Sequence, residues 1–477
     1  MAIEQLFRGD SASDSGCLQE LNFLAISESG QNSRKSVIET DRKNSQTPSF
    51  LPEGEPYEGS REIDFSVPIF PGENQHAAEI MSAPAPVKAD VQAKPANKYE
   101  KIVASQLNQM NDEAKFSIYT KEALLRDADK FPPVRNQAEN TTTYQMELFG
   151  FSDRDAAESA IEAQAYKRMV TVTVPDGAGS LKDCKFEFQD RRNIEQKELK
   201  ELISRAQQRQ VDTANSSDTE HKLPRPNDLA FFTHGIRTAG VSSDLYALSL
   251  QLTSGHSVVN VDWKSVPPSE ETGFDMEQKY NDERNRAAKS YPRFEKLIDE
   301  TIEHVGAEQT TIIAFSHGAM FNTRYLQHRK AAGSEQLNHV IFSHPDVPCR
   351  SLPQPGADGM VSAESRLFSC VAKQTHVIGS PADLALIGAA KNDEPRPEGR
   401  SKLSHYLKGT DEAYARIGNG AKISRNLVEG SGGTYVIETQ KGEKKDLMCH
   451  FINMQSIGEL MNGAPKLKVA AGMSEKK

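Results

Sequence analysis

The sequence predicts a doubly wound, mostly parallel α/β sheet, preceded by a small α+β domain and a disordered N-terminal tail. Short apolar or β-branched runs alternate with helical patterns after residue 228, as is typical of strands buried on both faces of a parallel sheet. A strand, helix, strand, strand and helix follow one another within 98–210, which indicates an α+β unit of split βαβ type. The first 97 residues are rich in Ser, Glu, Asn, Gln, Pro and Gly.

Composition divides the chain into segments. We expect a disordered tail and linker at 1–97 and the small α+β domain at 98–210. A second linker at 211–227, the main α/β domain at 228–465 and a flexible C-terminus at 466–477 follow. The tail ends in a Pro/Ala/Lys tract and buries too little apolar surface to offset its ordering entropy. Within the small domain, the pattern predicts a helix over 152–167 and a strand over 169–174.

The strands predicted for the main domain are 229–235, 256–263, 310–316, 338–346, 374–383 and 434–440. Between the second and third of them, 278–305 carries apolar residues at spacings of three and four, which predicts a helix. A polar tract, 391–409, is expected to form a surface loop or, alternatively, a lid over the site.

Charge and cysteine content exclude several functional classes. The formal net charge is −10 and no long basic block is present, so a nucleic-acid partner is not expected. The 5 cysteines are scattered without a C-x-x-C pair, which argues against a disulfide framework or a zinc cluster and favours a reducing compartment. No His, Asp or Glu pair has metal-ligand spacing on a predicted element, so neither a metal nor another cofactor is expected.

Targeting signals are also not visible. No segment approaches the ~18 continuous apolar residues of a membrane span, and the N-terminus lacks the basic start and long apolar region of a secretory signal. We therefore expect a cytoplasmic protein, with export as an effector that has no cleavable signal peptide as the alternative.

Ser316 is the candidate nucleophile. In 314-AFSHG-318 an apolar strand ends on this serine and a helical segment follows at once. The stretch matches G-x-S-x-G with Ala314 in the first glycine position, and this is the nucleophile elbow of α/β-hydrolases, in which a strained turn exposes the hydroxyl. The alternative is a serine that caps the following helix.

Backbone N–H groups near this elbow are candidates for an oxyanion hole. An earlier strand ends in 231-FFTHGIR-237, and its turn is expected to bring Gly235 or Ile236 beside the elbow. Their N–H groups would act together with that of His317 on a developing negative charge. The alternative is that His234 and Gly235 only form a tight loop.

The candidate acid and base follow Ser316 in the order Ser, Asp, His that this fold class requires. Asp383 lies beyond the second strand after the nucleophile and is the expected acid, with Asp346 as the alternative acid or a strand-end capping residue. His450 lies between the last predicted strand and a terminal helix and is the expected general base. The competing histidines are His317, His344, His376 and His405.

Taken in order, these features resemble the bacterial α/β-hydrolases catalogued as domain of unknown function nine hundred. The features that carry the resemblance span 228–462 and are His234-Gly235, Trp263 in VDWKS, Tyr280 with Asp282, Ala314-x-Ser316-x-Gly318, Pro345-Asp346-Val347, 383-DLAL-386, 415-ARIG-418 and His450. The resemblance implies a hydrolase constellation and leaves the substrate open.

The function expected from these residues is that of a serine hydrolase. It would act on carboxylic esters, lipid esters included, through Ser316, His450 and Asp383. The alternative is a non-catalytic α/β-hydrolase-like scaffold, whose tail and small domain recruit protein partners that the sequence does not identify.

Overall fold

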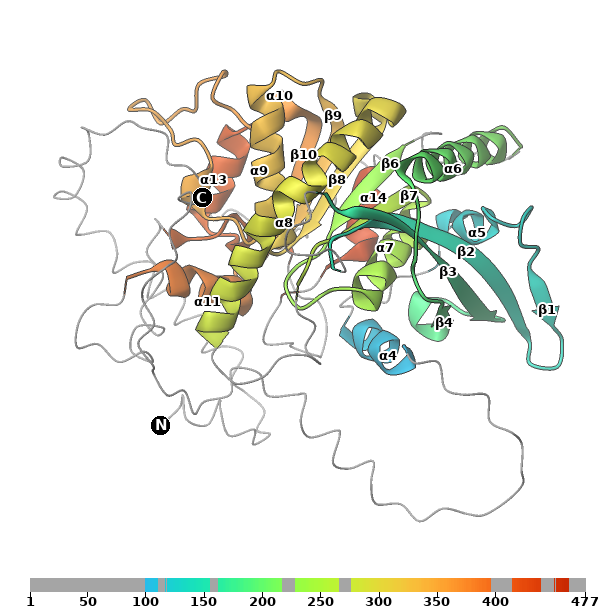
Figure 1. Ribbon diagram of the computed structural model, residues 1–477. Helices are drawn as coiled ribbons and strands as arrows, with labels where there is room; N and C mark the ends of the chain where they lie inside the picture. The colour runs from blue at the N-terminus through green and yellow to red at the C-terminus, as the bar shows by residue number, and fades with distance from the viewer. Residues whose placement is uncertain are drawn as a thin grey trace, which may run out of the picture. The chain divides into compact units, whose positions relative to one another are not determined.

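The computed structural model describes residues 99–109, 116, 118–154, 162–216, 228–265, 276–395, 414–438, 450 and 452–462 of the chain (Figure 1). The predicted tail at 1–97, the predicted C-terminus at 466–477 and most of the polar tract 391–409 lie outside the described residues. All described residues belong to one compact unit. Among them, no helix is both long and apolar enough to cross a membrane.

One mixed sheet organises the described chain, in the order β11-β10-β9-β8-β6-β7-β2-β3-β4. From β7 to β11 neighbouring strands are parallel. These six strands are β6 (Leu229–Thr233), β7 (Ser257–Asp262), β8 (Thr310–Phe315), β9 (Leu337–Ser343), β10 (Ala372–Gly379) and β11 (Thr434–Ile437). All six predicted strands of the main domain are therefore present, several with shorter bounds than expected.

Helices cover both faces of these parallel strands. One face packs into a core with α7 (Val241–Ser254), α14 (Met454–Met461), α4 (Glu100–Gln109) and α5 (Ile118–Leu125). Ile313 and Phe315 of β8 belong to that core, whereas the alternate residue Ile312 does not, because successive side chains of a strand point to opposite faces. The other face meets α9 (Gly318–Ala331) and α10 (Phe368–Val371), and α8 (Met276–Val305) packs on α9.

The strand order changes direction beside β6. From β6 the chain passes to β7 on one side and then to β8 on the other, after which β9, β10 and β11 follow outward. Ligands of open α/β sheets bind at the carboxyl ends of the strands where the order changes in this way. The ends of β6 and β8 are therefore the place where the fold favours a site.

The segment 98–210 differs from the expected separate domain, because its strands extend the same sheet. Figure 1 shows β2 (Thr141–Ser152) and β3 (Gln164–Pro175) as long strands beyond β7. Phe149–Ser152 pair in parallel with Val259–Asp262, and Phe151 is fully buried there. β7 would otherwise be an unpaired edge, and covering a buried edge satisfies its backbone donors and acceptors. The predicted domain boundaries themselves remain predictions.

Three further elements complete this part of the sheet: β1 (Val134–Asn136) pairs with β2, while β4 (Lys185–Phe188) and β5 (Arg192–Asn193) pair with β3. The helix predicted over 152–167 is wrong at 164–167, which belong to β3, where Tyr166, Arg168 and Val170 alternate as buried residues. Cross-sheet burial overrides the local helical preference. The helix α6 (Gln196–Ser216) also continues into the linker predicted at 211–227.

A buried polar network joins this extension to the parallel strands. Arg191 forms ion pairs with Asp244 of α7 at 2.8 Å and with Asp262 at the end of β7. Tyr166 of β3 donates to Asp244 at 2.5 Å, and so does Asn260 of β7 at 2.9 Å. Since breaking a buried charged network is costly, these contacts fix β3 and α7 against the site edge of the sheet.

Candidate active site

Ser316 occupies a sharp turn between β8 and α9. Its φ is 52°, a left-handed conformation that a non-glycine residue rarely adopts, and its backbone N–H donates to Ser343 O at 3.0 Å. Gly318 is required beside it, because a Cβ there would lie 2.4 Å from Thr233 O and 2.6 Å from His234 O. The strain expected of a nucleophile elbow, of the order of 1–3 kcal/mol, is therefore present at Ser316.

His450 connects this hydroxyl to Asp383. The Ser316 hydroxyl lies 2.8 Å from His450 Nε2, and His450 Nδ1 lies 2.7 Å from Asp383 Oδ2. Asp383 follows β10 and begins α11 (Leu384–Asp393), where its Oδ1 accepts from Leu386 N at 3.0 Å. The structure therefore brings the three predicted residues together although 67 and 134 positions separate His450 from the other two.

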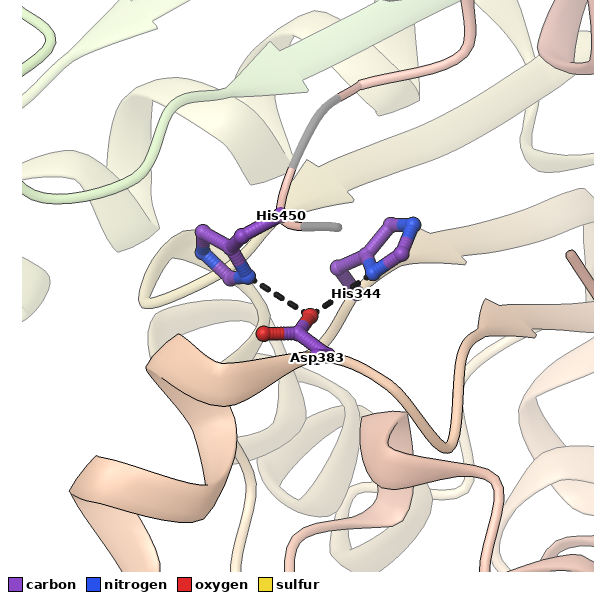
Figure 2. A group of neighbouring side chains, drawn as sticks. All are labelled: His344, Asp383 and His450. Carbon is purple, nitrogen blue, oxygen red and sulfur yellow. Dashed lines mark hydrogen bonds and ion pairs between the residues drawn. The ribbon is translucent and has the colours of Figure 1, made fainter. Parts of the chain in front are cut away.

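Asp383 is fully buried, and its environment favours the charged form. Burial raises the pKa of this carboxyl, but the His450 and His344 imidazoles that face it lower the pKa by more, so that it lies below its ordinary range. Figure 2 shows the carboxylate between the two rings. A carboxylate held ionised in this way can orient an imidazole and stabilise its protonated form.

Asp346, the alternative acid, lies in a separate network. It follows β9, where it accepts from His317 Nδ1 at 2.7 Å, Arg416 Nε at 2.7 Å and the Tyr280 hydroxyl at 2.9 Å. Burial raises the pKa of Asp346, but Arg416, His317 and Tyr280 together lower it by more, leaving it below the ordinary range. The structure thus places Asp383, and not Asp346, beside His450.

The backbone at Gly235 approaches the Ser316 hydroxyl closely. A Cβ at Gly235 would lie 2.8 Å from Ser316 Cβ and 3.3 Å from Ser316 Oγ, so only glycine fits without displacement. Within the described part of the chain, no residue accepts a hydrogen bond from the backbone N–H of Gly235, Ile236 or His317. These three donors are the ones predicted for the oxyanion hole.

The loop that carries Gly235 is held by residues at the end of β7. Trp263, fully buried, donates from Nε1 to His234 O at 2.9 Å, and the two rings stack with their centroids 5.2 Å apart. His234 Nε2 lies 3.1 Å from Asp262 Oδ1. Burial raises the pKa of Asp262, while Arg191 and His234 lower it by more, so that it lies below its ordinary range. The network that anchors β3 therefore also supports the loop beside Ser316.

His344 has a place in the site that the sequence reasoning missed. It is buried after β9 with a φ of 45°, and its Nδ1 lies 2.8 Å from Asp383 Oδ2. Its Nε2 lies 3.0 Å from Glu438 Oε2, just beyond β11. Burial lowers the pKa of His344, but its hydrogen bonds to the two carboxylates raise it by more, to about 9. No signal in the sequence indicated this contact, because the strands predicted over 338–346 and 434–440 placed both residues inside strands, whereas β9 ends at Ser343 and β11 at Ile437.

The same side chains have a spacing that could hold a metal ion. His344, Asp383 and His450 offer ligand atoms within 4.8 Å of one another. The sequence predicted no metal because the three are far apart in the chain, and their grouping arises only on folding. Both imidazole contacts with Asp383 have hydrogen-bond lengths, 2.8 and 2.7 Å. These lengths fit hydrogen bonds in which a proton lies between each imidazole nitrogen and the Asp383 oxygen.

The other competing histidines do not contact the hydroxyl within the described residues. His376 lies on β10 with its ring 6.1 Å from that of His339, and burial lowers its pKa. His405 lies outside the described residues.

Comparisons with known proteins identify no family. No protein-family model matches the chain, and no curated protein matches it in sequence. Solved structures similar to it include an esterase from Pyrobaculum calidifontis, with 12% identity, 57% of this chain and 94% of that chain covered, and a TM-score of 0.28. A hormone-sensitive lipase from a metagenome library has 11% identity and a TM-score of 0.28, with 77% of this chain and 96% of that chain covered. The esterase LipW from Mycobacterium marinum has 10% identity and a TM-score of 0.28, with 78% of this chain and 91% of that chain covered. At identities and TM-scores this low, the likeness establishes neither the family nor the activity of this chain.

Proposed function

We propose that the chain is a serine hydrolase of the α/β-hydrolase type that acts on carboxylic esters, lipid esters included. The observation that carries the proposal is the hydrogen-bonded series from Ser316 Oγ through His450 to Asp383, with contacts of 2.8 and 2.7 Å. The strained turn at Ser316 and the change of strand order beside β6 support it.

In the proposed mechanism, Ser316 Oγ attacks the ester carbonyl while His450 Nε2 accepts its proton. The resulting imidazolium is stabilised by Asp383, and the N–H groups of residues 235, 236 and 317 face the negative oxygen of the tetrahedral intermediate. When that intermediate collapses, His450 returns the proton to the departing alcohol. Water then attacks the acyl-enzyme with His450 as the base, which releases the carboxylic acid and restores Ser316.

The scaffold alternative requires a serine without a base in reach. Abstraction of the proton needs a heavy-atom separation of about 2.6–3.2 Å, and His450 lies 2.8 Å from the hydroxyl. This contact favours catalysis over a purely structural role.

A fluorophosphonate probe tests the proposal directly. We expect the probe to label the purified protein at Ser316 alone, as located by mass spectrometry, and not to label Ser316→Ala. On p-nitrophenyl esters of increasing acyl length, the Ser316→Ala and His450→Ala variants should each lose roughly 10³-fold or more in kcat. Folded wild-type protein that is neither labelled nor active on any ester would support the scaffold instead.

A further inference from the structure

His344 is the buried titratable group nearest the site that the proposed mechanism leaves without a role. It contacts Asp383 Oδ2, the same oxygen that His450 contacts, and it contacts Glu438 on its other side. We propose that His344 is a positioning residue that, with Glu438, extends the triad into a series of five side chains. This inference rests on the proposed function.

The backbone holds the His344 ring in one place. Its N–H donates to Ile378 O of β10 at 2.8 Å, and its φ of 45° turns the side chain at the end of β9. The side chain is 1% exposed, whereas that of Glu438 is 18% exposed. Figure 2 shows His344 and His450 approaching Asp383 from two sides. With Oδ1 bound by Leu386 N, the carboxylate has one oxygen directed at both rings.

If both carboxylates are ionised, the two contacts of His344 need a proton on each of its nitrogens. A neutral imidazole donates from one nitrogen only, so one carboxylate would then face a lone pair. Among the residues that the structure describes, the charged groups facing His344 are Asp383 at the start of α11 and Glu438 after β11, and the His450 ring lies 5.8 Å away. The raised pKa of His344, about 9, agrees with an imidazolium at neutral pH.

Charge balance gives this imidazolium a consequence for the base. Two carboxylates and one imidazolium together present a single net negative charge to His450, as one aspartate alone would. Removing the positive charge while Glu438 remains would leave two negative charges beside His450 and would favour its protonated form. The enzyme would then lose its free base at a higher pH.

The test compares His344→Gln, Glu438→Gln and the double variant by the pH dependence of kcat/KM on a p-nitrophenyl ester. His344→Gln should lower kcat with little change in KM and move the acidic limb upward by about one to two pH units, the effect of a unit charge ~6 Å away at an effective dielectric constant of ~20. Glu438→Gln should move the limb downward or leave it in place. The double variant removes one charge of each sign and should return the limb toward the wild type, which a loss of packing would not do.

His376→Gln is the matched control, because it makes the same substitution on the neighbouring strand away from the triad, and its pH profile should remain that of the wild type. An active His344→Gln variant with unchanged kcat and acidic limb would overturn the inference while leaving the proposed function intact. If His344→Gln does not fold, the Glu438→Gln variant decides. An acidic limb of its kcat/KM profile that moves to higher pH than in the wild type overturns the inference. Folded wild-type protein without labelling or hydrolysis overturns the proposed function and this inference together.

Discussion

Replacing Asp383 and Asp346 in turn by asparagine should separate catalysis from stability. Asp383 and Asp346 each contact a histidine at 2.7 Å, and both follow a strand of the same sheet. Asp383→Asn keeps the cap on α11, since an asparagine oxygen also accepts from Leu386 N, but it removes the charge that faces His450. Asp346→Asn leaves the contacts of Ser316, His450 and Asp383 in place and removes a charge that faces Arg416.

The contacts give the expected magnitudes. Without its acid partner the base adopts the wrong tautomer, so Asp383→Asn should lower kcat about 10⁴-fold. Because His344 keeps its contact with Glu438 at 3.0 Å, the same change should reduce the free energy of unfolding by only about 1–3 kcal/mol. Breaking a buried ion pair reduces the free energy of unfolding by about 3–5 kcal/mol. The loss for Asp346→Asn should be near the low end of this range, because Arg416 still forms an ion pair with Asp393 at 2.9 Å. The folded fraction of Asp346→Asn should retain kcat within about tenfold of the wild type.

Urea denaturation monitored by circular dichroism gives the stability of each variant, and the rate of p-nitrophenyl ester hydrolysis per mole of folded protein gives its activity. The reasoning is refuted if Asp346→Asn abolishes turnover in protein that remains folded while Asp383→Asn retains it. That result would make Asp346 the acid and would require His317 to act on Ser316.

The remaining predictions concern the oxyanion loop, acidity and metals. Gly235→Ala would place a Cβ 2.8 Å from Ser316 Cβ and should lower kcat at least about tenfold with a smaller effect on thermal stability, whereas a fully active variant would contradict the proposed hole. The pKa of His344 is raised from 6.5 to about 9, so protonation of His344 stabilises the fold fully below pH 6.5, and this stabilisation is lost as pH rises through 9. The loss in the free energy of unfolding should reach about 3 kcal/mol. His344→Gln should make that free energy depend less on pH in urea titrations at several pH values. Dialysis against EDTA should leave ester hydrolysis unchanged, and a loss that Zn²⁺ restores would show that His344, Asp383 and His450 bind a functional metal.

Local pattern was sufficient for the parallel strands and for the residues that follow them. A short apolar run ending in Ser-His-Gly predicts both the strand and the turn after it, because the apolar run and the small residues of the turn are adjacent in the chain. Ser316 and Asp383 follow β8 and β10, and the carboxyl ends of these parallel strands share one edge of the sheet, which brings the two residues to the same place.

Contacts between distant segments could not be predicted in this way. The pairing of β2 with β7 depends on an edge that only the folded sheet presents, so a plausible helix and a separate domain were expected instead. Glu438 lies 94 positions from His344, and nothing in the spacing indicates that an acidic residue after the last strand faces that histidine. Sequence patterns locate strand ends, but strand order decides which ends are neighbours.

His317 and His450 both lie beside Ser316 and each contacts an aspartate, and burial and charge explain why only His450 suits a base. The His317 ring is fully buried, stacks toward Trp263 at 6.3 Å and meets Tyr280 edge-on at 5.3 Å. Asp346, which contacts His317, also forms an ion pair with Arg416. The role of His317 and Asp346 is therefore to pair buried polar groups and to hold the turn after the nucleophile. His450 retains 17% exposure and reaches the hydroxyl with the nitrogen that Asp383 does not contact. A base must exchange protons with a substrate, and of the two histidines only this one has both the free nitrogen and the access.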